Sequence, residues 1–358
     1  MGNNRTVFLV TGAAGFIGFH MVMKLLKNDF LVYGIDNLND YYDVNLKISR
    51  LMECGVDHSL VSDDIPVRSS LYSGYTFQKS DITNHVLISN LFSKENFDYV
   101  IHLAAQPGVR YSIINPKAYT HSNIDGFLSI LEACRNNRIR HLLFASTSSV
   151  YGLNSSLPYD ESLTTDHPIS LYAATKKANE VMAHSYSHLY GVPTTGMRFF
   201  TVYGPWSRPD MAMFLFAESI VNDKPIQVFN GGKMIRDFTF IDDIIESMYR
   251  LAFVIPKRDD YWNSCEPGLG SSLAPYSIYN IGNNNAVELL DYIAALELSL
   301  GKKAIKDFID LQSGDVLATY ANTTKLVNAI NFKPNTDIGV GVQRFVDWYR
   351  KYYNRLSK

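Results

Sequence analysis

The chain has 358 residues, 46% of them hydrophobic and 19% charged, which excludes a disordered or low-complexity protein. Its 33 basic and 35 acidic side chains give a formal net charge of −2, so no broad positive field favours nucleic-acid binding. Its apolar runs are too short to cross a bilayer, no signal peptide precedes the first of them, and three widely spaced cysteines fit a reducing compartment. We therefore expect a cytoplasmic protein with no membrane or nucleic-acid partner.

The first 200 residues alternate short apolar runs with helical patterns. Strands are expected at Val7–Val10, Leu31–Ile35, Tyr75–Phe77, Tyr99–Leu103, Leu142–Ala145 and Thr194–Met197, and helices at Phe16–Lys27, Ser122–Cys134 and Leu171–Tyr190. Near-continuous apolar strands that alternate with helices are typical of a parallel sheet covered on both faces. The expected fold class is therefore α/β, with a Rossmann-type doubly wound parallel sheet.

The pattern loosens after about Phe200. Further helices are expected at Met213–Val221, Asp242–Phe253, Glu288–Leu300 and Val340–Tyr353, and short strands at Ile226–Phe229 and Ala304–Phe308. We expect a first domain over residues 1–200 and a smaller α/β domain over 201–358, some of whose segments return to the first. Residues 54–74 are expected to form an insertion and residues 256–275 an exposed loop.

A glycine-rich turn follows the first predicted strand. Gly12 would allow the tight turn, Gly15 would let a pyrophosphate approach the backbone, and Gly18 would permit close helix–sheet packing. Asp36, at the end of the second strand, can accept hydrogen bonds from both ribose hydroxyls and would repel a 2′-phosphate. The alternative is an ordinary turn, but the two signals together favour NAD over NADP as a cofactor.

A cluster of hydroxyl groups follows a later strand. Thr147 stands in this cluster, and Tyr172 and Lys176 lie further along the chain, four residues apart on one face of a predicted helix. We expect the ammonium group to lower the pKa of the phenol and make it a general base near neutral pH. The alternative is a packed tyrosine with a solvated lysine.

Several segments together resemble the UDP-glucuronate 4-epimerase family, which belongs to the extended short-chain dehydrogenases/reductases. The resemblance rests on TGAAGFIG at Thr11–Gly18, DNLNDYYDVNLK at Asp36–Lys47, AAQPGVRYS at Ala104–Ser112, the segments Ser146–Gly152 and Tyr172–Lys176, RFFTVYGPW at Arg198–Trp206, RPDMA at Arg208–Ala212, RDFTFIDD at Arg236–Asp243 and QSGDV at Gln312–Val316. It covers most of the chain. The segments DNLNDYYD and RPDMA are the most specific to the uronate branch of the family.

The resemblance implies a mechanism in which Tyr172 takes the proton from the sugar 4-hydroxyl while C4 passes a hydride to NAD. Thr147 would hydrogen-bond the same oxygen, and Lys176 would bind the nicotinamide ribose. The 4-keto sugar would then rotate in the site and receive the hydride on its opposite face. Because no net redox results, NAD is expected to stay bound and to be recycled.

The resemblance also implies two sets of binding residues. The cofactor would contact Gly12, Gly15, Phe16, Ile17, Gly18, Asp36, Asn37, Asp81, Ile82, Leu103, Ala104, Ala105, Gln106, Asn123, Ser146, Tyr172, Lys176 and Phe199. The UDP-sugar would contact Arg110, Thr147, Ser148, Ser149, Thr201, Arg208, Val228, Arg236, Gln312 and Asp315. Within the second set, Arg208 would bind the sugar carboxylate, Arg236 the diphosphate, and the last two residues the UMP part.

Related chemistries differ at the residues after Thr147. Family members that eliminate water carry Asp-Glu there, and those that decarboxylate the uronate typically carry Glu. Ser148 and Ser149 cannot serve as general acid or base at neutral pH, so an epimerase is favoured. A 4-epimerase of UDP-N-acetylhexosaminuronate or of a neutral UDP-hexose remains open, whereas an intact Thr147/Tyr172/Lys176 set argues against a catalytically silent NAD-binding regulator.

The sequence supports three further predictions, which concern a metal site, two carboxylates and the oligomeric state. His184 and His188 lie four apart on a predicted helix, but without a third ligand they are not expected to bind a metal. Asp242 and Asp243 are interpreted as helix caps rather than catalytic groups. The surplus of apolar residues on the helices Ser122–Cys134 and Leu171–Tyr190, together with the resemblance, indicates a homodimer.

Overall fold

The computed structural model describes residues 5–310 and 317–356. Its main helices are α1 (Phe16–Leu26), α2 (Val44–Glu53), α3 (His85–Glu95), α4 (Tyr111–Ile114), α5 (Pro116–Tyr119), α6 (Gly126–Asn137), α7 (Leu171–Tyr190), α8 (Ala212–Val221), α9 (Ile241–Ala252), α10 (Leu289–Leu300), α11 (Thr324–Ile330) and α12 (Ile338–Leu356). Its strands are β1 (Val7–Thr11), β2 (Leu31–Asp36), β3 (Pro66–Arg68), β4 (Tyr75–Lys79), β5 (Tyr99–His102), β6 (His141–Thr147), β7 (Thr194–Phe199), β8 (Thr201–Tyr203), β9 (Pro225–Phe229), β10 (Ile235–Phe240), β11 (Tyr276–Ile281), β12 (Ala286–Glu288), β13 (Ile305–Ile309) and β14 (Ala318–Thr319).

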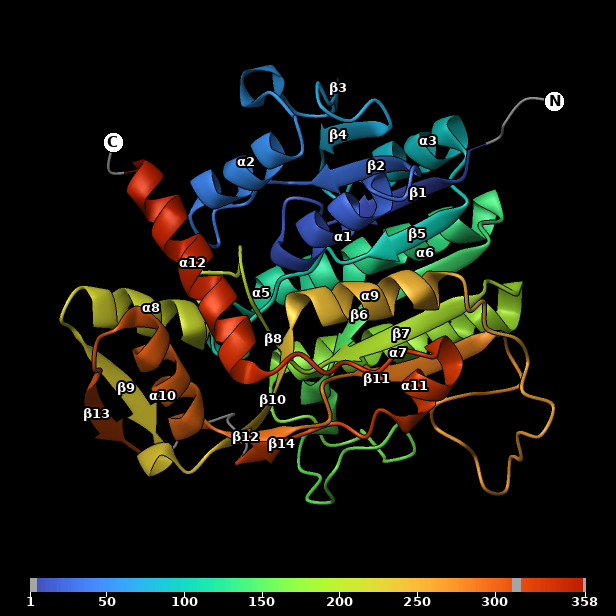
Figure 1. Ribbon diagram of the computed structural model, residues 1–358. Helices are drawn as coiled ribbons and strands as arrows, with labels where there is room; N and C mark the ends of the chain where they lie inside the picture. Colours follow the sequence, from blue (N-terminus) through green and yellow to red (C-terminus); the bar gives the residue numbers. More distant parts are fainter. Residues whose placement is uncertain (1–4, 311–316, 357–358) are drawn as a thin grey trace.

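An eight-stranded sheet forms the centre of the molecule, with the strand order β11-β7-β6-β5-β1-β2-β4-β3 (Figure 1). Every neighbouring pair is parallel except β3 with β4, which is antiparallel. The chain order reverses direction between β1 and β5, where a doubly wound sheet opens a crevice at the carboxyl ends of its strands. The predicted α/β fold with a doubly wound parallel sheet is therefore confirmed.

The sheet buries a separate apolar core on each face. Along β1, Phe8 and Val10 belong to one core while Leu9, between them, belongs to the other, because successive side chains of a strand point to opposite faces. Helices α3, α6 and α7 cover the second of these faces, and α1 and α9 pack together on the first. This two-sided burial explains why the strands read as continuous apolar runs.

The second half of the chain builds most of a smaller unit, which lies below and to the left of the large sheet in Figure 1. Here β10 pairs with β12, β14 and β8, while β13 and β9 form a separate parallel pair. Some elements of this half return to the first. Strand β11 completes the edge of the eight-stranded sheet beside β7, and α9 packs against α1.

Residues 54–74, expected as an insertion, contain the short strand β3 at the sheet edge. The helix α2, which precedes them, was not predicted. Its N-terminus is capped by the Asp43 carboxylate, which accepts a hydrogen bond from the Asn45 backbone N–H at 2.9 Å. Cys54 follows the helix and its side chain is buried, so this region packs onto the first core.

The interpretation of Asp242 and Asp243 as helix caps is wrong. They lie in the first turn of α9, whose N-cap is Phe240 and has no side-chain hydrogen bond. Asp243 instead accepts hydrogen bonds from the backbone N–H groups of Asn335 and Thr336 at 3.2 and 2.9 Å. Asp242 pairs with Arg344 of α12 at 2.7 Å. Both carboxylates therefore tie α9 to the C-terminal segment.

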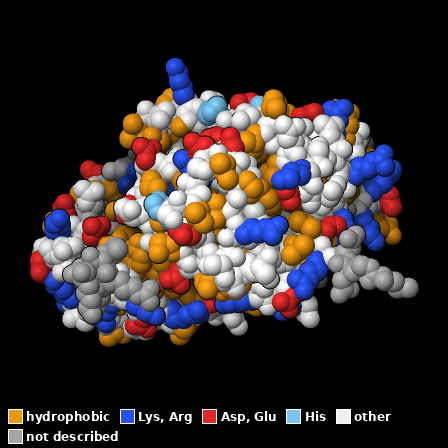
Figure 2. All heavy atoms as spheres, turned by 90° about the horizontal axis from the view of Figure 1, so that it is seen from above, with side chains coloured by type: hydrophobic (Ala, Val, Ile, Leu, Met, Phe, Trp, Pro, Cys, Tyr) orange, Lys and Arg blue, Asp and Glu red, His pale blue; other side chains and the backbone are white. Residues whose placement is uncertain are grey.

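The outer surface mixes charges of both signs. On the face shown in Figure 2, lysine and arginine side chains are interspersed with aspartate and glutamate, in keeping with the small net charge. Across residues 5–310 and 317–356, no helix combines the length and the apolar character that a bilayer crossing requires.

Candidate functional site

The glycine turn joins β1 directly to α1. Gly12 has a φ of +71°, and a side chain there would meet the backbone of Ala104 at 2.9 Å. A side chain at Gly18 would lie 2.0 Å from the Gly12 carbonyl oxygen. The turn therefore requires glycine at both positions, and it leaves the N-terminus of α1 facing a cavity that these residues line. Backbone N–H groups at a helix N-terminus suit a phosphate group.

Asp36 lies at the end of β2, next to this turn. Its carboxylate accepts hydrogen bonds from the backbone N–H groups of Ala14 at 3.2 Å and Leu38 at 2.8 Å, and the residue also lines the cavity. The carboxylate is thus fixed beside the phosphate-binding turn, where a ribose of a dinucleotide would lie. These residues fit NAD, because the turn admits a pyrophosphate and the acidic side chain admits an unphosphorylated ribose.

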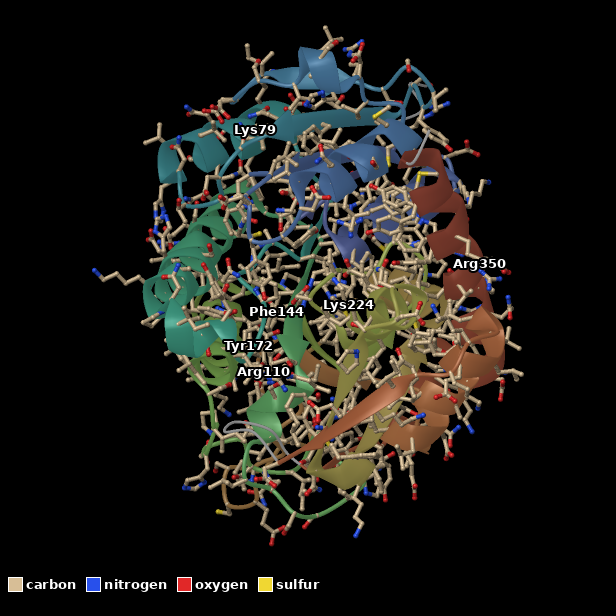
Figure 3. All side chains as sticks on the ribbon, turned by 90° about the vertical axis from the view of Figure 1, so that its left-hand side faces the viewer. Lys79, Arg110, Phe144, Tyr172, Lys224 and Arg350 are labelled. Carbon is tan, nitrogen blue, oxygen red and sulfur yellow. The ribbon has the colours of Figure 1, made fainter. Side chains whose placement is uncertain are left out.

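The cavity has a volume of about 380 Å³ and brings together most of the predicted site residues. Its lining includes Gly12, Gly15, Phe16, Ile17, Gly18, Asp36, Asn37, Ile82, Leu103, Ala104, Ala105, Ser146, Thr147, Ser148, Ser149, Tyr172, Lys176, Phe199, Thr201 and Arg208. Residues from α1, β2, β6, β7 and α7 thus meet at one edge of the sheet. Figure 3 labels Tyr172, which lies inside the outline of the molecule, between the helices of the first half and the elements of the second.

Three predicted cofactor residues lie outside the lining of this cavity. Asp81 accepts a hydrogen bond from the Asn37 side chain at 2.9 Å, so it supports a residue that lines the cavity. Asn123 is buried and accepts a hydrogen bond from the Gln106 backbone N–H at 2.7 Å. Its side chain also donates to the Thr175 hydroxyl at 3.1 Å. Asn123 and Gln106 therefore join the segment after β5 to α7.

Tyr172 and Lys176 lie one turn apart on α7 and face the end of β6. The helix starts at Leu171 because the Ser170 side chain caps it, accepting a hydrogen bond from the Ala173 N–H at 3.1 Å. Thr147, the last residue of β6, forms a hydrogen bond with Tyr172 that lowers the pKa of the phenol. The predicted set Thr147, Tyr172 and Lys176 is therefore gathered at one place.

The pKa of Tyr172 depends on its burial and on the charges around it. Burial raises the pKa of this tyrosine above its usual value, and the charge of Arg208 and the hydrogen bond from Thr147 lower it by less. Burial also lowers the pKa of Lys176 to about 8, while Glu180 acts in the opposite direction. Among the groups of the chain itself, desolvation of the phenolate outweighs the nearby charges, so the lowering of the phenol pKa by Lys176 stays a prediction for the protein with its cofactor bound.

A buried ion pair behind the catalytic set was missed by the sequence reasoning. Glu180, one turn beyond Lys176 on α7, accepts two hydrogen bonds of 2.9 Å from Arg198 of β7. It also accepts one of 2.6 Å from the hydroxyl of Ser146 on β6. The pair fixes α7 against the ends of two strands. A glutamate four residues after the lysine was the only local signal.

A second, smaller cavity of about 170 Å³ adjoins the first, since Ser148, Ser149 and Thr201 line both. Arg236 and Thr319 line its far side, and Arg236 donates a hydrogen bond to the Leu317 carbonyl oxygen at 3.2 Å. The predicted diphosphate-binding arginine thus lies one cavity away from Tyr172. A substrate with two linked parts would fit across both cavities.

Two other predicted substrate residues, Arg110 and Val228, do not line either of these cavities. The guanidinium group of Arg110 lies over the ring of Phe229, 4.5 Å from its centroid. Val228 is fully buried in the first apolar core. Gln312 and Asp315 lie outside the described residues.

Several cavity residues were not predicted as site residues. Asn39, Tyr41, Tyr42 and Lys47 line the first cavity from the segment after β2 and from α2, although the sequence reasoning quoted that segment only for its resemblance. The fully buried Arg50 holds this segment in place by donating hydrogen bonds to the Tyr42 hydroxyl and to the Trp206 carbonyl oxygen, each at 2.7 Å. No local pattern in the sequence marks these contacts.

The His184 and His188 pair does not resemble a metal centre. The two rings stack with centroids 6.3 Å apart, and His184 hydrogen-bonds the Ser272 hydroxyl at 3.0 Å. Within the described part of the chain, no group of three His, Cys, Asp or Glu side chains is arranged to hold a metal ion.

Comparison with known proteins gives consistent matches along the chain. Residues 8–261 match the family model described as "NAD dependent epimerase/dehydratase family". The chain is 51% identical to "Protein CapI" of Staphylococcus aureus, over 97% of this chain and 99% of that protein. It is 42% identical to a "Probable UDP-glucuronate 4-epimerase" of Rhizobium meliloti, over 97% of this chain and 98% of that protein.

A solved structure matches the whole arrangement as well. It is the UDP-glucuronic acid 4-epimerase of Bacillus cereus, crystallised with UDP-glucuronic acid and NAD. It aligns with a TM-score of 0.83 and 32% sequence identity, covering 97% of this chain and 100% of that one. The glycine turn with Asp36, the set of Thr147, Tyr172 and Lys176, and these matches lead to one conclusion: the chain belongs to the NAD-dependent epimerase/dehydratase family.

Proposed function

We propose that this protein is a UDP-glucuronate 4-epimerase, which interconverts UDP-glucuronate and UDP-galacturonate with a tightly bound NAD. The observation that carries the proposal is one cavity lined by Arg208, Tyr172 and Thr147 together with the glycine turn and Asp36. Such a cavity combines a general base, a dinucleotide site and a cation suited to a carboxylate. The named relatives of R. meliloti and B. cereus support the same substrate.

In this proposal, the residues around the glycine turn hold NAD, with Asp36 on the adenosine ribose and Lys176 on the nicotinamide ribose. NAD, when bound, supplies a hydride acceptor and donor at the sugar C4. Tyr172 takes the proton from the 4-hydroxyl and later returns it. Thr147 orients the same oxygen, and the hydroxyls of Ser148 and Ser149 hold the sugar without adding a second acid or base.

The substrate would extend from the first cavity into the second. Arg236, which lines the second cavity, would bind the diphosphate, because a guanidinium group offers two parallel donors to phosphate oxygens. The other predicted residues that line the two cavities keep their proposed roles, whereas Arg110 and Val228 line neither cavity. We propose the same division of the chain into two domains as the sequence predicts: residues 1–200 mainly bind NAD, and residues 201–358 mainly bind the UDP-sugar.

The direct test is to incubate the purified protein with UDP-glucuronate and to separate the sugar nucleotides by chromatography. We expect UDP-galacturonate to appear without added cofactor and to reach equilibrium with its epimer. UDP-glucose and UDP-N-acetylglucosaminuronate, tested in parallel, would identify the alternative substrates. Turnover of either one in preference to UDP-glucuronate would contradict the assignment.

The bound cofactor gives a separate prediction. Because Asp36 is fixed beside the phosphate-binding turn, its carboxylate would repel the 2′-phosphate of NADP. Protein denatured after purification is expected to release NAD in nearly stoichiometric amount and no NADP. The measurement is chromatography of the released nucleotide against both standards. Release of NADP, or a protein that needs continuous addition of cofactor, would contradict this prediction.

We also propose that the enzyme is a homodimer. The support comes from α7, which exposes the large apolar side chains of Val181 and Leu189. Light scattering at micromolar concentration is expected to give twice the mass of 40.4 kDa. A Val181→Lys variant would place a charge on the proposed interface and shift the mass toward the monomer. A monomeric wild-type protein would contradict the proposal.

We propose further that the enzyme works in the cytoplasm and supplies a sugar donor for polysaccharide synthesis. The three cysteines support the location, because Cys54, Cys134 and Cys265 are all free thiols, as a reducing compartment favours. The product supports the pathway class, since a UDP-activated uronate is the form that a glycosyltransferase consumes.

A further inference from the structure

The guanidinium group of Arg208 is already engaged by a carboxylate of the protein. Its Nε donates to Asp210 Oδ1 at 2.9 Å and its Nη2 donates to Asp210 Oδ2 at 3.0 Å. Both side chains are about a quarter exposed, at 25% and 29%. Arg208 lines the first cavity, and Asp210, an exposed residue next to it, pairs with it from outside the cavity lining. The two-pronged face that suits a substrate carboxylate is therefore occupied by Asp210.

Asp210 is also held by a residue of the segment that follows β2. The Tyr41 hydroxyl donates a hydrogen bond to Asp210 Oδ2 at 3.1 Å, and its ring packs 5.0 Å from the ring of Tyr111. Tyr41 belongs to the segment after β2 that lines the cavity near Asp36. Although burial acts to raise the pKa of Asp210, Arg208 and these hydrogen bonds hold it below its usual value, so the carboxylate is charged at neutral pH.

We propose that Asp210 is a specificity-determining residue that competes with the carboxylate of the sugar for Arg208. The inference rests on the proposed function, because it requires a uronate substrate. One guanidinium group cannot offer the same pair of donors to two carboxylates at once, and two carboxylates on one cation repel each other. A uronate must therefore displace Asp210 or share Arg208 with it, and either event weakens the binding of the uronate. A neutral sugar does not compete for Arg208, so its binding is not weakened in this way.

This competition favours the release of product in a reaction whose substrate and product carry the same carboxylate. An unpaired arginine at the cavity wall would bind both epimers tightly and slow the release of product. An internal carboxylate lowers the affinity for both by the same amount and keeps the arginine neutralised between turnovers. Tyr41 keeps Asp210 in place without itself carrying a charge.

The test measures binding rather than turnover. In a Tyr172→Phe background, which retains the bound sugar unchanged, dissociation constants for UDP-glucuronate and UDP-glucose are measured by calorimetry on the NAD-loaded protein. Asp210→Asn keeps the shape of the side chain and removes its charge. We expect it to increase the preference for UDP-glucuronate over UDP-glucose by about threefold to fivefold, the upper part of the range of an exposed ion pair.

Tyr41→Phe is the matched control. It removes the hydrogen bond to Asp210 but keeps the negative charge, so the preference is expected to stay within about twofold of the reference. If Tyr41→Phe raises the preference as much as Asp210→Asn, displacement of the loop rather than charge competition is responsible, and the inference is overturned. Asp210→Ser, checked by its NAD content and thermal melting, replaces the asparagine variant if that variant does not fold.

An unchanged or smaller preference in Asp210→Asn would also overturn the inference, because Asp210 would then only orient Arg208. Conversion of UDP-glucuronate by the wild-type protein separates this failure from that of the proposed function. Conversion with an unchanged preference refutes the competition alone. Absence of conversion refutes the proposed function and the competition together.

Discussion

Replacing Tyr172 with phenylalanine is expected to lower kcat for UDP-glucuronate by about 10²- to 10⁴-fold, the usual contribution of a positioned general base. The ring still fills its place on α7, so the cavity and its hydrogen-bonding groups on Thr147 and Lys176 are retained. What is lost is the group that removes the proton from the sugar 4-hydroxyl. The measurement is the initial rate of UDP-galacturonate formation, with NAD content checked in the same preparation.

Tyr190→Phe provides the matched control for this variant. Tyr190 is the last residue of the same helix, it is 43% exposed, and it does not line the cavity. The same chemical change there is expected to leave the rate within about twofold of wild type. A loss of less than tenfold in Tyr172→Phe, with full NAD content, would show that another group acts as the base.

Replacing Arg208 with alanine is expected to lower kcat/KM for UDP-glucuronate by about 10- to 150-fold, which corresponds to about 1.5–3 kcal/mol for hydrogen bonds to a charged group. Oxidation at C4 creates a ketone β to the C6 carboxylate, and β-keto acids lose CO₂ readily. A cation that holds this carboxylate both binds the sugar and restrains its departure. Some oxidised sugar is therefore expected to leave as a 4-keto pentose, detectable by mass spectrometry.

The neutral substrate separates the two ways in which Arg208 could act. Its charge also lowers the pKa of Tyr172, so its loss would impair proton removal from any sugar. UDP-glucose lacks the carboxylate, and if it is processed, its turnover is expected to fall much less than that of UDP-glucuronate. Equal losses for both sugars would mean that Arg208 acts only through Tyr172, and the choice of a uronate would lose its structural support.

The sequence by itself determined the cofactor half of the site, because its signals are local. A strand, a turn with Gly12 and Gly18, and a helix follow one another without interruption, and steric contact with the backbone leaves no choice of residue at those glycines. The spacing of Tyr172 and Lys176 equals one helical turn, so any helix there places them together. The apolar strands of the first half likewise require burial on both faces.

The tertiary structure decided the contacts made between distant segments. Strand β11 was missed because Ser277 and Asn280 make it look polar, yet all six of its residues are buried. Asn280 is satisfied only in the folded chain, where its side chain accepts a hydrogen bond from the Tyr151 hydroxyl at 2.7 Å. The pairs Glu180 with Arg198 and Tyr41 with Asp210 likewise join residues 18 and 169 positions apart. Hydrophobic periodicity indicates which face of an element is buried, but it does not indicate which polar groups of distant segments meet in the folded chain. The pKa of Tyr172 depends on those groups and on the burial that the whole fold imposes, so the sequence alone could not predict it.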